Sequence, residues 1–131
     1  MNRPTKAQEE MAIFEHSFER IQKMFRLNGD AKEIKAYLFE HDLADFLVWV
    51  QQPIIDVFGD CRTELELQFD KEDNKTMLLL TVYPDMLLEE DQLMDLHDIF
   101  NDLIADYRSI DSVLKYLYFD LWGFNTPNYI W

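Results

Sequence analysis

The chain has 131 residues, and its 12 Lys or Arg against 26 Asp or Glu give a formal net charge of −14 at pH 7. This length fits one domain, residues 1–131, and a hydrophobic content of 48% predicts a packed interior and excludes global disorder. The acidic balance argues against nucleic acid or an anionic membrane as a ligand, because both would repel the chain, and it favours a basic protein partner.

The charge is unevenly distributed along the chain. Residues 1–35 contain seven basic and six acidic residues and net +1, whereas residues 36–131 contain five basic and twenty acidic residues and net −15. No Lys or Arg lies between Lys75 and Arg108, a stretch that holds eight acidic residues. Any partner is therefore expected to carry positive charge that complements the acidic residues 36–131.

The sequence indicates a cytoplasmic protein. Its first residues lack the apolar stretch of a secretory signal, and no apolar run approaches the roughly 20 residues that span a bilayer. The single cysteine, Cys61, excludes a disulfide within the chain and is consistent with a reducing compartment. Arg62 is adjacent, but Asp60 opposes thiolate formation, so we expect a buried or unreactive thiol.

Residues 5–27 predict a long amphipathic helix. Thr5 can cap its first turn, and Asn28-Gly29 is typical of a helix end because both residues tolerate the left-handed conformation. The apolar side chains repeat every three or four residues and form one stripe: Met11, Phe14, Phe18, Ile21 and Phe25. This stripe predicts packing against the core, and a homodimer interface through this helix is the alternative.

A second helix is expected over residues 31–40, where Asp30 and Glu33 resemble a capping box. The side chains expected to face inward are Ile34, Tyr37 and Leu38. The pattern predicts a short helix with one apolar face.

Asp42 is then expected to cap a third helix over residues 43–52. Pro53 either kinks this helix or begins a further turn over residues 54–58. Gly59 is expected to end that segment, because glycine is common just after a helix.

Residues 63–69 alternate apolar and polar side chains, which is typical of a half-buried strand. The side chains expected to face the core are Leu65, Leu67 and Phe69. Residues 77–83 are nearly all apolar and predict a more central strand that ends at Pro84. Because the loop over residues 70–75 is short, we expect the two strands to form an antiparallel hairpin.

Residues 91–107 predict an amphipathic helix. Its apolar face comprises Leu93, Leu96, Phe100, Leu103, Ile104 and Tyr107. Residues 112–124 fit either a helix or a strand, and their aromatic density favours a third strand paired with the hairpin. Residues 123–131 predict an irregular aromatic tail that docks on the body. The expected fold is thus α+β, with N-terminal helices, an antiparallel hairpin extended to three strands, and an acidic amphipathic helix.

Five aspartates share one face of the helix predicted over residues 91–107: Asp91, Asp95, Asp98, Asp102 and Asp106. Their spacing places them within about 80° of arc and about 5–6 Å apart along the helix axis. No cation at helical spacing neutralises them, so the row is either a solvated face or a docking surface for a basic partner. A metal site on Asp98 and Asp102 is a third interpretation, but no EF-hand pattern accompanies them and we expect no metal.

Aromatic residues are unusually frequent towards the C-terminus. They comprise Tyr116, Tyr118, Trp122, Tyr129 and Trp131. Trp122, with Trp49 expected at the edge of the core, is expected to contribute to partner binding beside acids such as Asp45 and Asp120, because Trp and Tyr are enriched at interfaces. The alternative is that these rings fill the core.

The sequence shows no catalytic motif. His16, His41 and His97 share no metal-ligand spacing, and no serine lies in a Gly-x-Ser-x-Gly context. We therefore expect no catalytic residues, no cofactor and no metal.

The run DLADFL at residues 42–47 is followed by PIIDVFG at residues 53–59, by two strands and by an acidic helix. This order, over residues 40–105, resembles a loosely defined group of small uncharacterised bacterial proteins that are common in cyanobacteria and include antitoxin-like members. The resemblance lies in order and pattern and assigns no functional residue.

The leading hypothesis is a non-enzymatic acidic binding module, antitoxin- or immunity-like, that neutralises or regulates a basic protein. A second hypothesis is a DNA mimic that inhibits a nucleic-acid-binding protein, although the row carries one charge per about 5–6 Å and a DNA strand carries one per about 3.4 Å. A third is an enzyme or small-ligand protein whose site is assembled across the fold.

Overall fold

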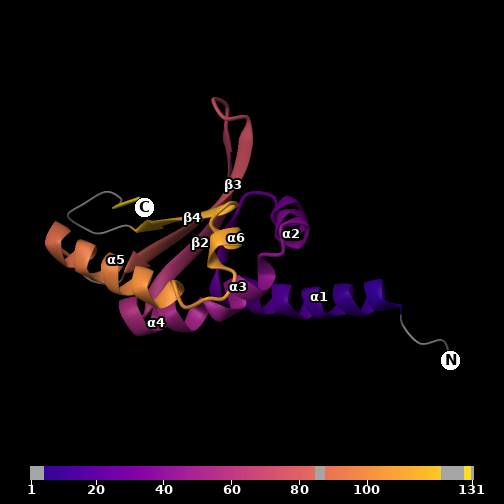
Figure 1. The fold of residues 1–131 in the computed structure, drawn as a ribbon, viewed down its shortest axis with the longest axis horizontal. Helices are drawn as coiled ribbons and strands as arrows, with labels where there is room; N and C mark the ends of the chain where they lie inside the picture. The colour runs from indigo at the N-terminus through magenta and orange to yellow at the C-terminus, as the bar shows by residue number, and fades with distance from the viewer. Residues whose placement is uncertain (1–4, 85–87, 122–128, 131) are drawn as a thin grey trace.

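The computed structural model describes residues 5–84, 88–121 and 129–130. These residues form an α+β fold of six helices and one five-stranded mixed sheet (Figure 1). The strands lie in chain order, β1-β2-β3-β4-β5. The predicted combination of N-terminal helices, a hairpin and an acidic helix is confirmed.

The first helix, α1 (Lys6–Met24), begins with a capping box in which Thr5 Oγ1 accepts a hydrogen bond from the Gln8 N–H at 3.1 Å. The helix ends at Met24, so the predicted end at residue 27 is wrong. Phe25 is extended and almost fully buried, and the next residues form β1 (Arg26–Asn28), which pairs in parallel with β2. Tertiary strand pairing outweighs the local helical pattern here.

The first half of α1 projects from the body of the molecule, as Figure 1 shows. Phe14, Phe18 and Ile21 of the predicted stripe are buried, but Met11 is exposed. The prediction for Met11 is therefore wrong, because this turn lies in the half of α1 that projects from the body.

The second helix, α2 (Ala31–Glu40), has the predicted bounds, but Asp42 plays a different role from the predicted one. Asp42 has a positive φ of 55° and ends α2 rather than capping the next helix. The Leu43 N–H donates to the Leu38 carbonyl at 3.0 Å, and the Asp42 N–H donates to the Phe39 carbonyl. This is a Schellman motif, which Asp tolerates better than most residues.

Two further helices follow, α3 (Ala44–Trp49) and α4 (Gln51–Phe58). The helix predicted over residues 43–52 is therefore divided at Val50, and Pro53 lies in the first turn of α4, where a missing N–H costs little. Gly59 ends α4 with a φ of 67°, as predicted.

The predicted hairpin is confirmed: β2 (Cys61–Asp70) pairs with β3 (Lys75–Pro84) along its whole length. Its tip extends beyond the rest of the sheet (Figure 1), which leaves Phe69 exposed and the prediction of an inward Phe69 wrong. Leu65 and Leu80 are opposite one another in register and fully buried.

The ambiguous segment divides into a short helix, α6 (Ile110–Val113), and the predicted third strand, β4 (Leu117–Leu121), parallel to β3. The prediction of an irregular tail is wrong at residues 129–130, which form β5 (Tyr129–Ile130) antiparallel to β4. The rest of that predicted tail, including Trp131, lies outside the described residues.

The acidic helix, α5 (Glu90–Ile104), packs against α4. Phe100 of α5 is fully buried, with its ring centroid 5.4 Å from Phe58 and 5.3 Å from Phe119. The helix ends before Tyr107, which lies half-buried in the following turn. The contacts of Phe100 with Phe58 and Phe119 fix which face of α5 points to solvent.

Tyr37 joins α2 to the sheet. Its hydroxyl lies 2.8 Å from the Tyr116 carbonyl and 3.0 Å from the Thr76 carbonyl, so its proton is shared between β3 and the residue that precedes β4. Burial, followed by the charges of Tyr116 and Glu40, raises the pKa of Tyr37 to about 12. The hydroxyl is therefore a proton donor at neutral pH.

Candidate functional site

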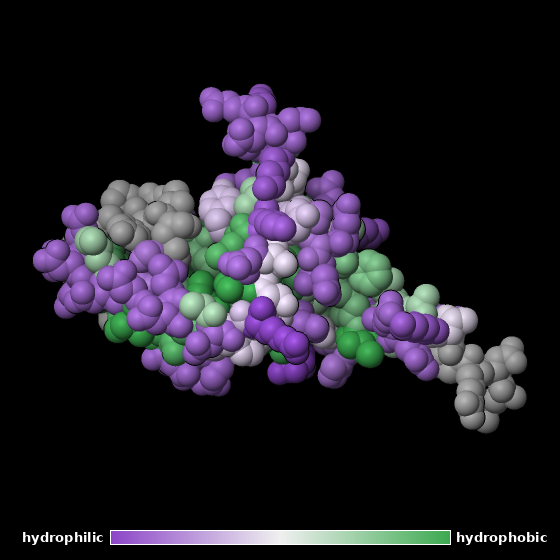
Figure 2. All heavy atoms as spheres, in the orientation of Figure 1, coloured by the Kyte–Doolittle hydropathy of each residue, from purple (hydrophilic) through white to green (hydrophobic). Residues whose placement is uncertain are grey.

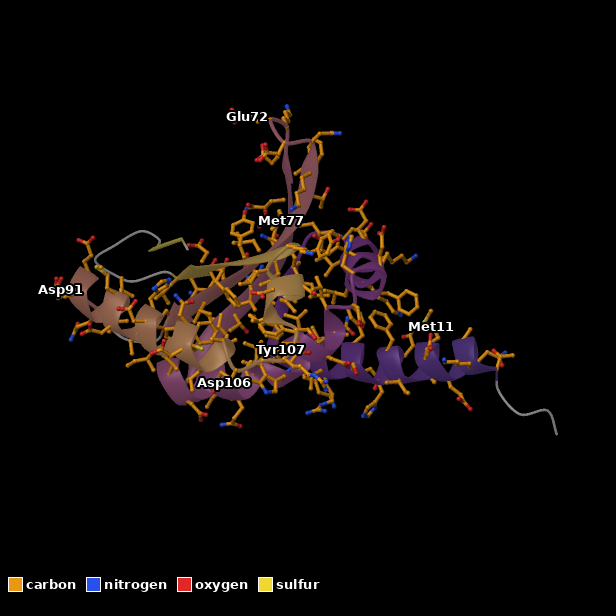
Figure 3. The ribbon with its side chains drawn as sticks, viewed as in Figure 1. Met11, Glu72, Met77, Asp91, Asp106 and Tyr107 are labelled. Carbon is orange, nitrogen blue, oxygen red and sulfur yellow. The ribbon has the colours of Figure 1, made fainter. Side chains whose placement is uncertain are left out.

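The five aspartates predicted as a row, Asp91, Asp95, Asp98, Asp102 and Asp106, are all exposed. The first four lie on α5, and Asp106 follows its last turn. Figure 3 labels the two ends of the row, Asp91 at the free end of α5 and Asp106 beside Tyr107. We call these five residues the aspartate row.

Two apolar side chains border the aspartate row. Met94 is 43% exposed and Ile99 is 51% exposed. At about 100° per residue, Met94 lies on one side of the row and Ile99 on the other. Figure 2 accordingly shows hydrophilic atoms over α5 with hydrophobic atoms beside them. The sequence reasoning missed both residues, although their helical positions relative to the aspartates are readable from the spacing.

The aspartate row is not neutralised by Lys or Arg within the described part of the chain. Asp98 lies 3.5 Å from His97 Nδ1, and α5 has no basic residue in its last turn. Carboxylates are favoured near the N-terminus of a helix and disfavoured near its C-terminus. Asp102 and Asp106 therefore stand where the helix dipole opposes them.

The structure places Trp49 next to the C-terminal end of the aspartate row. The Trp49 ring is 4.9 Å from that of Tyr107, the neighbour of Asp106, and Trp49 is 36% exposed, at the edge of the core as predicted. The pKa of Tyr107 is raised, first by burial and then by the charges of Asp45 and Asp42. An aromatic group with carboxylates around it thus continues the row. The other predicted tryptophan, Trp122, lies outside the described residues.

A metal site on Asp98 and Asp102 is the third interpretation of the row. No group of three or more His, Cys, Asp or Glu able to hold a metal ion occurs in residues 5–84, 88–121 and 129–130. Two carboxylates alone provide too few oxygens for Ca²⁺, which takes six to eight. Asp98 and Asp102 alone therefore do not complete a calcium site among the described residues.

A polar pocket of about 480 Å³ lies beside Cys61, between β1, β2 and β3. The described residues that line it are Met24, Arg26, Cys61, Arg62, Thr63, Glu64 and Tyr83, without a histidine among them. Burial, and then the charge of Asp60, raises the pKa of the Cys61 thiol. The thiolate needed for nucleophilic chemistry is therefore disfavoured there.

Comparison with known proteins gives no match to a protein family, to a curated protein or to a solved structure. The resemblance to small bacterial proteins stays a prediction. Within the described ranges, no helix is both long enough and apolar enough to cross a bilayer.

Proposed function

We propose that this protein is a non-enzymatic, cytoplasmic binding module that neutralises or regulates a basic protein partner, in the manner of an antitoxin or immunity protein. The observation that carries the proposal is the exposed aspartate row on α5, which no described Lys or Arg neutralises. A basic surface would supply the missing cations.

The energetics of the row support a role in binding rather than in folding. Aspartates at spacings of three and four residues on a helix repel one another, so the row costs the free protein stability. The side of α5 opposite the row carries the buried Phe100 and Leu93, which are sufficient to anchor the helix. A partner that brings Lys or Arg to the row would remove this repulsion on binding.

Met94 and Ile99 give the row a short-range component. Charged surfaces mainly accelerate association and select partners, whereas buried apolar contacts slow dissociation. The matching surface of a partner would carry Lys or Arg side chains opposite the carboxylates and small apolar side chains opposite Met94 and Ile99. Trp49 extends this surface at its C-terminal end.

The test is affinity purification of the tagged protein from its native host at low salt, with three versions of the protein. The row variant carries Asp95→Lys, Asp98→Lys and Asp102→Lys. A matched control carries Glu19→Lys, Glu72→Lys and Asp73→Lys, which are exposed acids on α1 and on the hairpin tip, and therefore changes net charge equally.

The wild type and the matched control should capture the same basic protein, released by high salt, and the row variant should capture none. Equal capture by all three versions would contradict the proposal, because net charge alone or another surface would then be responsible. Competition of the captured protein by duplex DNA would instead support mimicry of nucleic acid.

A further inference from the structure

A second surface lies where the first half of α1 faces the end of α2 and the start of α3. It is a groove of about 410 Å³, within the range of about 300–1,000 Å³ that is usual for binding pockets. The described residues that line it are Glu10, Ile13, Phe14, Ser17, Leu38, Phe39, Asp42, Ala44 and Asp45. We call it the α1–α2 groove.

The floor of the α1–α2 groove is apolar and aromatic. The Phe14 and Phe39 rings meet edge to face at 5.0 Å, which holds α1 against the end of α2. Ile13 is 65% exposed and Phe39 is 46% exposed, so two large apolar side chains remain available to a ligand. Figure 2 shows hydrophobic atoms over this part of α1 and α2. Exposed apolar side chains gathered in a groove are typical of binding surfaces.

The rim of the groove is acidic. Glu10 on α1, Asp42 after α2 and Asp45 on α3 contribute three exposed carboxylates, and the described lining holds no Lys, Arg or His. The Schellman motif explains the position of Asp42: its side chain does not cap α3, so the carboxylate remains available at the groove. The cation nearest in sequence to Phe39 on α2, Lys35, already pairs with Glu15 at 2.7 Å.

The acidic rim indicates the charge of the ligand that the groove binds. A second copy of the chain would bring a further net charge of −14 towards three carboxylates, which opposes self-association. We propose that the α1–α2 groove binds a short basic amphipathic segment of another protein, with one large apolar side chain on Ile13 and Phe39 and a Lys or Arg beside the rim carboxylates. Amphipathic helices dock into apolar grooves in this way in many complexes.

The aspartate row lies on and just after another helix, α5, and none of its five members lines the α1–α2 groove. The probe is a synthetic 15-residue amphipathic peptide of Leu and Lys, and the matched peptide has Glu in place of Lys. Binding is followed through the backbone amide NMR signals of the full chain, so that the contacted surface is located and the row variant can be compared directly.

The Leu/Lys peptide should shift amide signals around Ile13, Phe39 and Asp45, and the Leu/Glu peptide should not. Ile13→Ser should weaken the binding about tenfold or more, because truncation of an anchor residue removes most of a small contact. Ile55→Ser on α4 is the matched control, since Ile55 is also exposed but lies outside the groove. The row variant should retain these shifts.

Three results would overturn the inference: shifts confined to α5, equal binding by Ile13→Ser and by the control, or equal binding of both peptides. A fourth is a concentration-dependent shift at the groove without peptide that Ile13→Ser abolishes, since the occupant would then be a second copy. Because Ile13 is exposed, its substitution leaves the core intact, and a dispersed amide spectrum verifies the fold.

Discussion

Two surfaces of the molecule expose carboxylates in different settings. On α5 the aspartate row stands on a convex helix surface, with Met94 and Ile99 beside it. At the second surface, three carboxylates surround the apolar α1–α2 groove. A convex row acts through long-range attraction, whereas a groove acts through buried contact area. Partner selection and partner anchoring can therefore be located on separate elements.

The region of α1 and α2 also differs from the aspartate row in whether its charged side chains form ion pairs. Near α1 and α2, Lys35 pairs with Glu15 and lies 5.4 Å from the Phe18 ring, so at least one cation there has a structural role. Along the aspartate row, no described Lys or Arg pairs with a carboxylate. The uneven charge of the sequence thus has a spatial counterpart: the basic residues accompany α1 and α2, and the uncompensated acids accompany α5.

The largest expected effect concerns the buried side of α5. Phe100→Ala should lower the free energy of unfolding by about 3–5 kcal/mol, because it removes a fully buried ring from the contacts with Phe58 and Phe119. Urea unfolding followed by circular dichroism measures the change. A loss below about 1 kcal/mol would contradict the view that α5 is held by its apolar face.

Tyr37→Phe should cost about 1 kcal/mol, because it removes the hydroxyl that bonds to two carbonyls of the sheet. The pKa of Tyr37 is about 12 in the folded protein and about 10 in an unfolded chain. Below pH 10 both states are protonated and the stabilisation is complete. As pH rises from 10 to 12 the unfolded state loses its proton first, so this stabilisation is lost.

Wild type should therefore lose more stability than Tyr37→Phe between pH 10 and 12. Urea unfolding of both proteins at several pH values gives this difference, and comparison between them cancels the contribution of the other tyrosines. Parallel pH profiles would show that the Tyr37 hydroxyl does not join α2 to the sheet.

Thr5→Ala should cost about 0.5–1 kcal/mol, because Thr5 and Gln8 cap the projecting end of α1. The effect should be local, since this end packs on little else. Hydrogen exchange of the amides of residues 6–13 should accelerate, and the Leu/Lys peptide should bind the groove more weakly. Unchanged hydrogen exchange in these turns would show that the Thr5 cap does not order the part of α1 that lines the groove.

Asp102→Asn should have the smallest effect, a gain of a few tenths of a kcal/mol, because it relieves repulsion from Asp98 and Asp106 and from the helix dipole. The gain should disappear at 1 M salt, where charges are screened. Glu72→Gln at the hairpin tip is the control and should change little. A loss of stability in Asp102→Asn would mean that the row has a structural role.

Local signals in the sequence predicted much of this fold. Thr5 and Gly59 mark a helix start and a helix end because capping depends on neighbouring residues alone. Phe25 misled the prediction for the opposite reason. Phe25 leaves the helix because the residues of β1 pair with partners 38 residues along the chain, a pairing that periodicity does not encode.

The candidate sites divide in the same way. The aspartate row was predictable, because helical spacing alone places its members on one face. The α1–α2 groove was not, because Ile13, Phe39 and Asp45 come from three helices and meet only through packing. The one signal in the sequence that could have found it is Ile13, an apolar residue next to Phe14 that lies outside the predicted apolar stripe.

The most direct test of the central claim is a calorimetric titration of the captured basic protein against the wild type, the row variant and the matched control. The wild type and the control should bind with similar affinity that falls steeply with salt, while the row variant should show no measurable binding. Equal affinity of the row variant and the control would contradict the claim that the aspartate row is the binding surface.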